Sequence, residues 1–332
     1  MRAVTNEPDR QAASVARTDA SGVAADPVAP TAAAAGRGPA ALGTLAPVVF
    51  VILWSTGFVG AKYGLPSAEP FTFLLIRLAI ATVLLALIAA VVRQRVPASP
   101  RVWRDAAIVG LLLHGGYLGG VFFGIDRGVP AGVAAVIVSL QPVVTSLLVA
   151  GLLRDHVSGR QWLGLALGLG GVALVVLPGS FGTAGAALPA AGLAACVLAL
   201  AAGTGGTLYQ HRHGENVPLL YGTAIQYGAC TVLFGVLAPA TETMEVRWTG
   251  EFVVALVWLV LALSVGAILL LLTLLRRGSA VRVTSLLYLV PAATALEAYV
   301  LLGERLHALD VAGILIAVCG VALVLRRPAA AI

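Results

Sequence analysis

Apolar residues run through this chain in long blocks that show no alternation of polar and apolar positions. Each block is close to the ~20 residues that a helix needs to cross a hydrocarbon core about 30 Å thick. Backbone polar groups have no water to bond inside lipid, so these blocks are expected to cross as helices. The ten predicted helices cover residues 45–62, 71–92, 106–124, 131–153, 160–178, 187–209, 217–239, 252–275, 280–302 and 308–325.

One stretch of the chain, 129–176, occurs again at 278–325, at a shift of 149 positions and without a gap. Thirteen of the 48 aligned pairs are identical, among them Pro142 with Pro291. An internal repeat of this length indicates a duplicated architecture. Because each half has five crossings, an odd number, the second copy must enter the membrane from the opposite side. We therefore predict an all-α polytopic membrane protein whose ten transmembrane helices form two inverted five-helix repeats.

The repeat also sets the predicted domain boundaries. Residues 45–178 form the first repeat and 179–327 the second, between an Ala-rich tail at 1–44 and a short tail at 328–332. The first tail has no apolar run and is expected to be disordered. With the N-terminus inside, thirteen Arg residues from Arg37 onward lie on the cytoplasmic side, against four basic residues outside. This asymmetry predicts a multi-pass protein of the cell membrane with both termini in the cytoplasm.

Composition agrees with a lipid environment. Hydrophobic residues make up 59% of the chain and charged residues 11%, whereas soluble domains carry about 25% charged residues. The net charge of +6 comes from short links between apolar runs, which indicates control of topology in the bilayer rather than nucleic-acid binding. The three cysteines are isolated, so we expect no disulfide, metal or other cofactor. There is no Walker sequence, which disfavours direct ATP hydrolysis.

Pro142 and Pro291 lie at the middle of the fourth and ninth predicted helices. Each proline removes a backbone donor and clashes with the carbonyl four residues earlier, at Val138 or Leu287. A packed kink is one interpretation of either proline alone. Two prolines at matching positions of an inverted repeat favour a cavity near the middle of the membrane.

Polar residues at comparable depth support a solute pathway. Ser139 and Tyr288 are repeat partners three residues before the prolines, and Thr145 and Thr294 are partners three residues after them. A single Ser or Thr more often bonds to its own helix backbone than to a solute, so the prediction rests on the cluster. The remaining candidates are Trp54, Ser55, Thr56, His114, Tyr117, Thr204 and Thr207.

Four ionisable residues lie within or beside the apolar runs: Lys62, Arg77, His114 and Glu297. A charge in hydrocarbon is costly, so each is a candidate functional residue. Lys62 is near the outer boundary and is expected to anchor there. Arg77 and Glu297 are at similar depth, which favours a structural ion pair over a binding role. His114 is either a hydrogen-bonded core histidine or a proton-coupling group.

Short motifs occur in order along residues 45–326, among them LWSTGFVGAKYG at 53–64, LQP at 140–142 and LLGE at 301–304. With these motifs the chain resembles the EamA-type, ten-helix branch of the drug/metabolite transporter superfamily. The resemblance implies two inverted five-helix repeats, cytoplasmic termini and secondary transport, commonly export of amino acids or other small metabolites. The Leu-Gly-Glu motif at 302–304 reads Leu-Arg-Asp at 153–155, so the implied linker role applies to Glu304 only. The matching stretches are 53–64 (LWSTGFVGAKYG), 70–77 (PFTFLLIR), 130–135 (PAGVAA), 140–142 (LQP), 161–164 (QWLG), 171–174 (GVAL), 291–296 (PAATAL), 301–304 (LLGE) and Gly313.

These observations predict a secondary transporter that moves small amphipathic solutes by alternating access, driven by protons or by the solute gradient. An intramembrane enzyme is one alternative, although no nucleophile–base pair or metal-binding pattern occurs at membrane depth. A membrane scaffold without a solute pathway is another, and it would require a dry interface between the repeats. The sequence leaves the substrate, the direction of transport and the choice between monomer and homodimer open.

Overall fold

The computed structural model describes residues 40–152, 158–176, 188–213, 217–270 and 289–325. The predictions for the tail before residue 40, for the tail at 328–332 and for Tyr288 lie outside these ranges. Residues from Ala40 onward form one compact unit. Within the described ranges there is no β-strand, only an isolated bridge between Ala68 and Val246.

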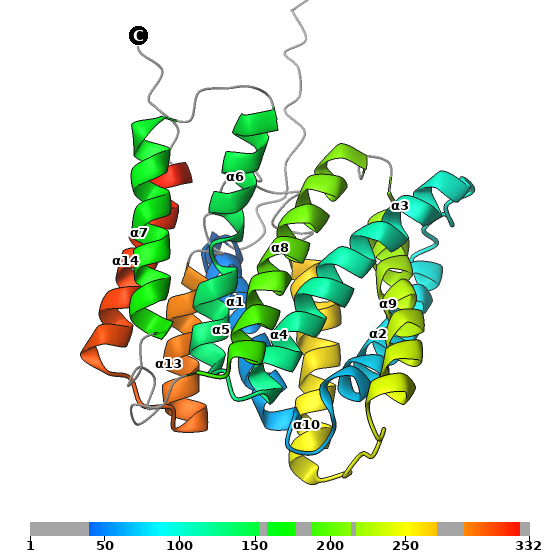
Figure 1. Cartoon of the computed structure of the whole chain (residues 1–332). Helices are drawn as coiled ribbons and strands as arrows, with labels where there is room; N and C mark the ends of the chain where they lie inside the picture. The colour runs from blue at the N-terminus through cyan, green and yellow to red at the C-terminus, as the bar shows by residue number, and fades with distance from the viewer. Residues whose placement is uncertain (1–39, 153–157, 177–187, 214–216, 271–288, 326–332) are drawn as a thin grey trace, which may run out of the picture. The chain divides into compact units, whose positions relative to one another are not determined.

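Each of the ten predicted segments contains a helix, which confirms the all-α membrane fold class (Figure 1). Five helical stretches are long and apolar enough to span a bilayer, and five shorter ones are also apolar. The third and eighth segments each include a π-helical stretch, η1 or η3. The elements are α1 (Ala40–Gly64), α2 (Pro70–Val91), α3 (Pro100–Gly110), η1 (Leu111–Gly116), α4 (Tyr117–Asp126), α5 (Ala131–Val138), α6 (Gln141–Leu152), α7 (Gly159–Val176), α8 (Ala190–His213), α9 (Leu219–Thr241), α10 (Gly250–Trp258), η3 (Leu259–Ala267), α13 (Val290–Leu302) and α14 (Ala308–Leu325).

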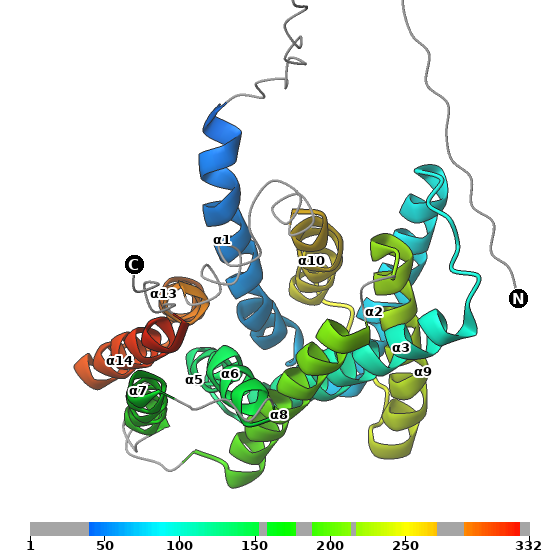
Figure 2. The same ribbon diagram turned by 90° about the horizontal axis from the view of Figure 1, so that it is seen from above.

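The helices pair as two related copies require. α7 packs along α14, α2 along α9, and α5 against α13, so that equivalent helices of the two repeats meet (Figures 1 and 2). α8 packs on α3, η1 and α4, while its repeat partner α1 packs on α10 and η3. These contacts between the repeats thus join either two equivalent helices or two helix pairs that are equivalent to each other.

Glycines allow the closest helix contacts. A Cβ on Gly171 of α7 would lie 2.5 Å from the carbonyl oxygen of Gly313 in α14. A Cβ on Gly320 of α14 would lie 2.6 Å from the carbonyl oxygen of Gly164 in α7. Small residues drive helix association in lipid because they let backbones approach. The predicted glycine packing seam is therefore present between α7 and α14.

The Leu-Gly-Glu motif joins the two repeats at a helix end. Gly303 ends α13 in the left-handed conformation, with φ of 66°, which glycine adopts without steric cost. The next residue, Glu304, accepts a hydrogen bond of 3.2 Å from the backbone N–H of Ala131, the first residue of α5. Burial raises the pKa of the Glu304 carboxyl, and this hydrogen bond opposes the rise. The linker role implied for Glu304 is thus that of a cap on a helix of the other repeat.

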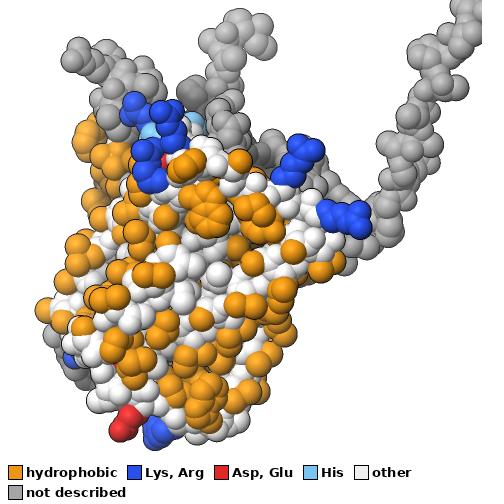
Figure 3. Space-filling model, turned by 90° about the vertical axis from the view of Figure 1, so that its right-hand side faces the viewer, with side chains coloured by type: hydrophobic (Ala, Val, Ile, Leu, Met, Phe, Trp, Pro, Cys, Tyr) orange, Lys and Arg blue, Asp and Glu red, His pale blue; other side chains and the backbone are white. Residues whose placement is uncertain are grey.

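The outer surfaces of α2 and α9 are apolar. Val83, Leu87, Val232 and Val236 expose between 56% and 69% of their surface. The face in Figure 3 carries apolar side chains over its middle and basic side chains at one end. An exposed apolar surface of this extent fits lipid contact.

Candidate functional site

A cavity of about 630 Å³ lies between the two repeats. Its walls come from helices of both copies, and most of the lining is apolar. Such a site, a mostly apolar hollow with a few placed polar groups, is typical of small-molecule binding. The polar residues lining it are Arg77, Asp105, His114, Tyr117, Ser139, Gln141, Thr145, Thr207, Gln210, His213, Thr223, Gln226 and Tyr227.

Helix breaks shape the middle of this cavity. The fourth segment is divided into α5, which ends at Val138, and α6, which begins at Gln141, with Ser139 between them. Pro142 is therefore at the start of a half-helix, not at a kink inside one helix as predicted. Pro291 has the same position in α13. Proline fits the first turn of a helix because no hydrogen bond is required of its nitrogen there.

The π-helical stretches η1 and η3 add a second matched distortion. A shift of 149 positions moves η1, Leu111–Gly116, to 260–265, which lies inside η3, Leu259–Ala267. Both contribute to the cavity wall, through His114 and Leu263. π-Helical turns are rare and are frequently found at functional sites. A helix break at Ser139 and π turns at matching positions of the two repeats thus contribute to one cavity.

The structure places seven of the predicted pathway residues on the cavity wall. Ser139 nevertheless also donates a 2.6 Å hydrogen bond to the carbonyl of Val136 in its own helix. Arg77, which was predicted to be part of an ion pair, lines the cavity as well. The seven are Trp54, His114, Tyr117, Ser139, Pro142, Thr145 and Thr207.

Other predicted residues are not among those lining the cavity. Thr56 and Thr204 donate to carbonyls of their own helices, at 2.6 Å and 2.8 Å, as the alternative interpretation expected. Ser55 is fully buried and lies 2.6 Å from Oε1 of Glu297. Pro291 and Thr294 are buried inside the bundle, and Tyr288 lies outside the described residues.

The predicted ion pair between Arg77 and Glu297 is not formed. Glu297 bonds to Ser55 on α1, whereas Arg77 reaches Ser264 on η3 at 3.3 Å and 3.4 Å. The similar depth expected for the two residues did not determine the direction of their side chains. The two residues are on α2 and α13, which face different neighbours.

A hydrogen-bonded group that the sequence did not single out lies beside Arg77. His114 Nε2 is 3.2 Å from Oε1 of Gln226, and the His114 ring packs edge-on against Tyr227 at 4.7 Å. Gln226 is the repeat partner of Arg77, a correspondence that could have identified it. Elsewhere in the lining, Gln141 Nε2 donates to Thr207 Oγ1 at 2.7 Å. The cavity thus contains amide, imidazole and phenol groups.

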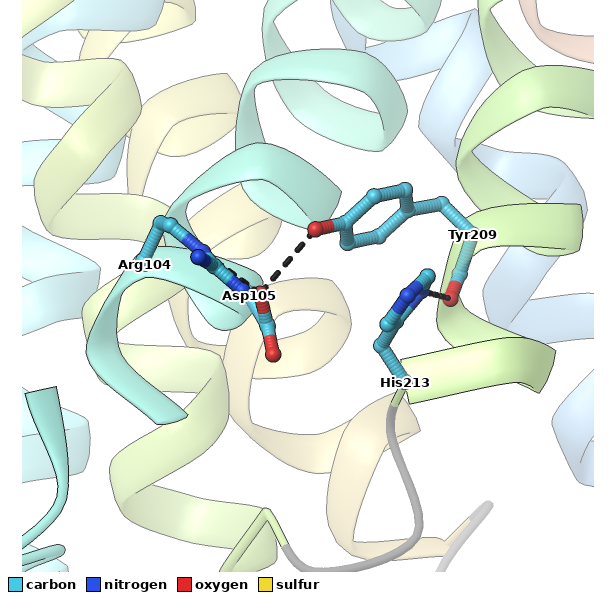
Figure 4. A network of polar contacts seen from close by, with 4 residues as sticks. All are labelled: Arg104, Asp105, Tyr209 and His213. Atoms are coloured by element: carbon cyan, nitrogen blue, oxygen red, sulfur yellow. Dashed lines mark hydrogen bonds and ion pairs between the residues drawn. The ribbon is translucent and has the colours of Figure 1, made fainter. Parts of the chain in front are cut away.

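At one end the lining reaches a charged cluster on α3 and α8. Asp105 accepts hydrogen bonds from Arg104 at 2.8 Å and 3.0 Å and from the Tyr209 hydroxyl at 3.0 Å (Figure 4). The ring of His213 stacks on that of Tyr209 at 4.2 Å. Asp105 and His213 also line the cavity.

At the opposite end, the links that follow α1 and α9 are joined to each other. Ser67 Oγ and Thr249 Oγ1 are 3.2 Å apart, and Ala68 pairs with Val246. Glu242 accepts bonds of 2.7 Å from two backbone N–H groups in the first turn of α2. We call this region, residues 66–72 with 242–249, the outer clasp. None of these residues lines the cavity.

The comparisons with known proteins agree with this geometry. The EamA-like transporter family matches residues 41–177 and, as a second copy, residues 190–326. The chain belongs to the EamA-like transporter family. The predicted resemblance is thereby confirmed, and the chain is an integral membrane protein of a transporter family.

Relatives of this EamA-like protein carry transporter names. "Uncharacterized transporter YvbV" of Bacillus subtilis (strain 168) is 25% identical over 281 residues, covering 82% of this chain and 88% of the relative. "Uncharacterized transporter sll0355" of Synechocystis sp. (strain ATCC 27184 / PCC 6803 / Kazusa) is 32% identical over 126 residues, 38% of each chain. A protein crystal structure superimposes with a TM-score of 0.59 at 20% identity, covering 85% of this chain and 96% of that one, and it supports the fold alone.

Proposed function

We propose that this EamA-like protein is a secondary transporter that exports small amphipathic metabolites, amino acids or solutes related to them, across the plasma membrane by alternating access. The observation that carries the proposal is the cavity between two copies of one helix bundle, with the break between α5 and α6 and the matched π turns η1 and η3 in its wall. In inverted-repeat transporters, solute sites lie near the midplane at the repeat interface, beside discontinuous helices.

The closed outer clasp and the charged lining at the other end support an inward-facing state. In this state a solute enters the cavity from the cytoplasm, past Asp105 and His213. Export then requires the hydrogen bonds between Ser67 and Thr249, and those of Glu242, to break while the cytoplasmic end closes. A hydrogen bond contributes about 0.5–1.5 kcal/mol net to stability. A clasp of a few such bonds can therefore open on the time scale of transport.

A disulfide across the outer clasp tests alternating access. Ser67→Cys with Thr249→Cys places two thiols where two hydroxyl oxygens are 3.2 Å apart. The background carries Cys196, Cys230 and Cys319 replaced by alanine, so that only the introduced pair can oxidise. Cells with and without the protein are compared for solutes that accumulate inside or outside, before and after oxidation. The expected result is a solute whose export stops on cross-linking and returns with a reductant.

Each single-cysteine variant is the matched control, because it meets the same oxidant without forming a bridge. Cross-linking is verified on the purified protein before transport is interpreted. Export that continues through a fully cross-linked clasp would contradict alternating access. Identical metabolite profiles with and without the protein, over a broad panel of amino acids and organic acids, would contradict the proposed transport function.

A further inference from the structure

Arg77 is the most deeply buried cation of the described residues, and it lines the cavity. Its side chain is on α2, 5% exposed, within a wall that also contains Phe122 and Tyr227. Nε and Nη2 both point to the Ser264 hydroxyl, at 3.4 Å and 3.3 Å. The guanidinium carbon is 5.9 Å from the centre of the Phe122 ring. These are long contacts for a charged donor, for which about 2.7–2.9 Å is usual.

The charge of Arg77 has no acidic partner among the described residues. The ion pairs found there involve Arg104, Arg127 and His307, and the nearest acid in depth, Glu297, is held by Ser55. The chain between residues 271 and 288, which is not described, contains no Asp or Glu in its sequence. The acids that remain lie in links or near helix ends, as Asp105 does at the cytoplasmic mouth.

An uncompensated guanidinium at this depth is costly in free energy, so its retention needs a reason. The group has five N–H donors in a rigid fork that matches the two oxygens of a carboxylate. Ser264 occupies one edge of the fork, and no described residue accepts a hydrogen bond from Nη1. The surrounding wall is mainly apolar, with Trp54, Phe58 and Leu263 within the same cavity. An anionic end beside an apolar body would therefore match this wall.

We propose that Arg77 receives the carboxylate of the transported solute, and that the cavity selects organic monocarboxylates with an apolar body. A free amino group finds no counter-ion at this depth, because no carboxylate of the described residues lies beside Arg77. Among the amphipathic solutes proposed above, the inference therefore favours monoanions related to amino acids over the zwitterionic amino acids themselves. This inference rests on the proposed function, since it takes the cavity to be the solute pathway.

Binding to the purified full-length protein in lipid nanodiscs tests the proposal without requiring transport. The probes are 3-phenylpropanoate, its neutral analogue 3-phenylpropanamide, and phenylalanine, which adds an ammonium group to the same skeleton. Isothermal titration gives each Kd at fixed pH and ionic strength. The acid is expected to bind at least about tenfold more tightly than either analogue, because removing one partner of a buried charge pair weakens binding strongly.

Arg77→Met should abolish the preference for the acid, and Arg77→Lys should retain part of it because the charge remains without the fork. Arg127→Gln is the matched control, since Arg127 is a basic residue that does not line the cavity. If Arg77→Met does not fold, the preference of the unmodified protein for the acid over the amide still tests the proposal. Equal binding of acid and amide, no binding of the acid at millimolar concentration, or phenylalanine binding as tightly as the acid would overturn the proposal. Acid-selective binding in a protein that moves no solute would leave the carboxylate site at Arg77 standing and would refute the proposed transport instead.

Discussion

The contact between α7 and α14 allows a quantitative test of the packing argument. In Gly171→Ala, the new Cβ lies 2.5 Å from the Gly313 carbonyl oxygen and 2.6 Å from the Ala317 nitrogen. Ordinary van der Waals contact begins at 3.4 Å, so the backbones must separate by about 0.9 Å, the difference between 3.4 Å and 2.5 Å. The obstacle is backbone on a packed helix, which cannot rotate away as a side chain can.

The expected cost follows from two known effects. Overpacking a well-packed contact costs about 1–3 kcal/mol, and a gap of about 0.5–1 Å forfeits a quarter to a half of the dispersion energy along the seam. Alanine also gains about 1 kcal/mol of helix propensity over glycine. Gly170→Ala isolates this gain, because nothing lies within 4 Å of the Cβ that it adds to the same helix. The free energy of unfolding of Gly171→Ala should therefore be about 1–3 kcal/mol lower than that of Gly170→Ala.

Unfolding in mixed micelles with increasing sodium dodecyl sulfate, followed by tryptophan fluorescence, measures this difference. Gly320→Ala meets the Gly164 oxygen at 2.6 Å and should cost a similar amount. The double variant of Gly171 and Gly320 should lose less than the sum, because helices already separated for one methyl group have room for the second. Equal stability of the Gly170 and Gly171 variants would refute the close seam.

Three further predictions concern carboxylates. Glu242→Ala should lower the free energy of unfolding by about 1–2 kcal/mol through loss of the α2 cap, whereas the exposed Glu245→Ala should not, as denaturant titration will show. Burial raises the pKa of Glu304, so the contribution of its protonation to stability is largest below the ordinary glutamate pKa and declines as pH rises through the raised pKa. Glu304→Gln should remove this decline. An unchanged pH profile of the free energy of unfolding would contradict the prediction. If Glu297 carries a coupled proton through its 2.6 Å contact with Ser55, Glu297→Gln should flatten the pH dependence of solute efflux from proteoliposomes, and an unaltered profile would exclude that role.

The helical segments were predictable because lipid imposes a strong and simple constraint. Any span must be apolar and must satisfy its backbone internally, so the ten segments appear directly in the sequence. The break in the fourth segment was harder to predict from the sequence. Pro142 indicated a disturbance, but a kink and the start of a new half-helix both accommodate proline, and only the packing of α5 and α6 decides between them.

Depth along the predicted helices selected candidate residues, but it did not give the direction of their side chains. Ser55 and Trp54 are adjacent in sequence, yet Trp54 lines the cavity while Ser55 is fully buried against α13. In a helix, successive side chains are separated by about 100°, so a neighbour in sequence faces another helix. The same reason separates Arg77 from Glu297. In a helix that is apolar all round, the sequence does not show which face points to the cavity. Tertiary packing determines that orientation.

The two repeats share their scaffold but not their chemistry. The glycine seam, the π turns and the prolines at helix starts all recur at a shift of 149 positions. At the same shift, Arg77 corresponds to Gln226, His114 to Leu263, and Glu297 to Leu148. The proposed alternating access requires the two halves to exchange structural roles, which would account for the duplicated scaffold. The proposed solute, with one anionic and one apolar end, is itself asymmetric, so a wall that recognises it needs one charged side and no charged counterpart.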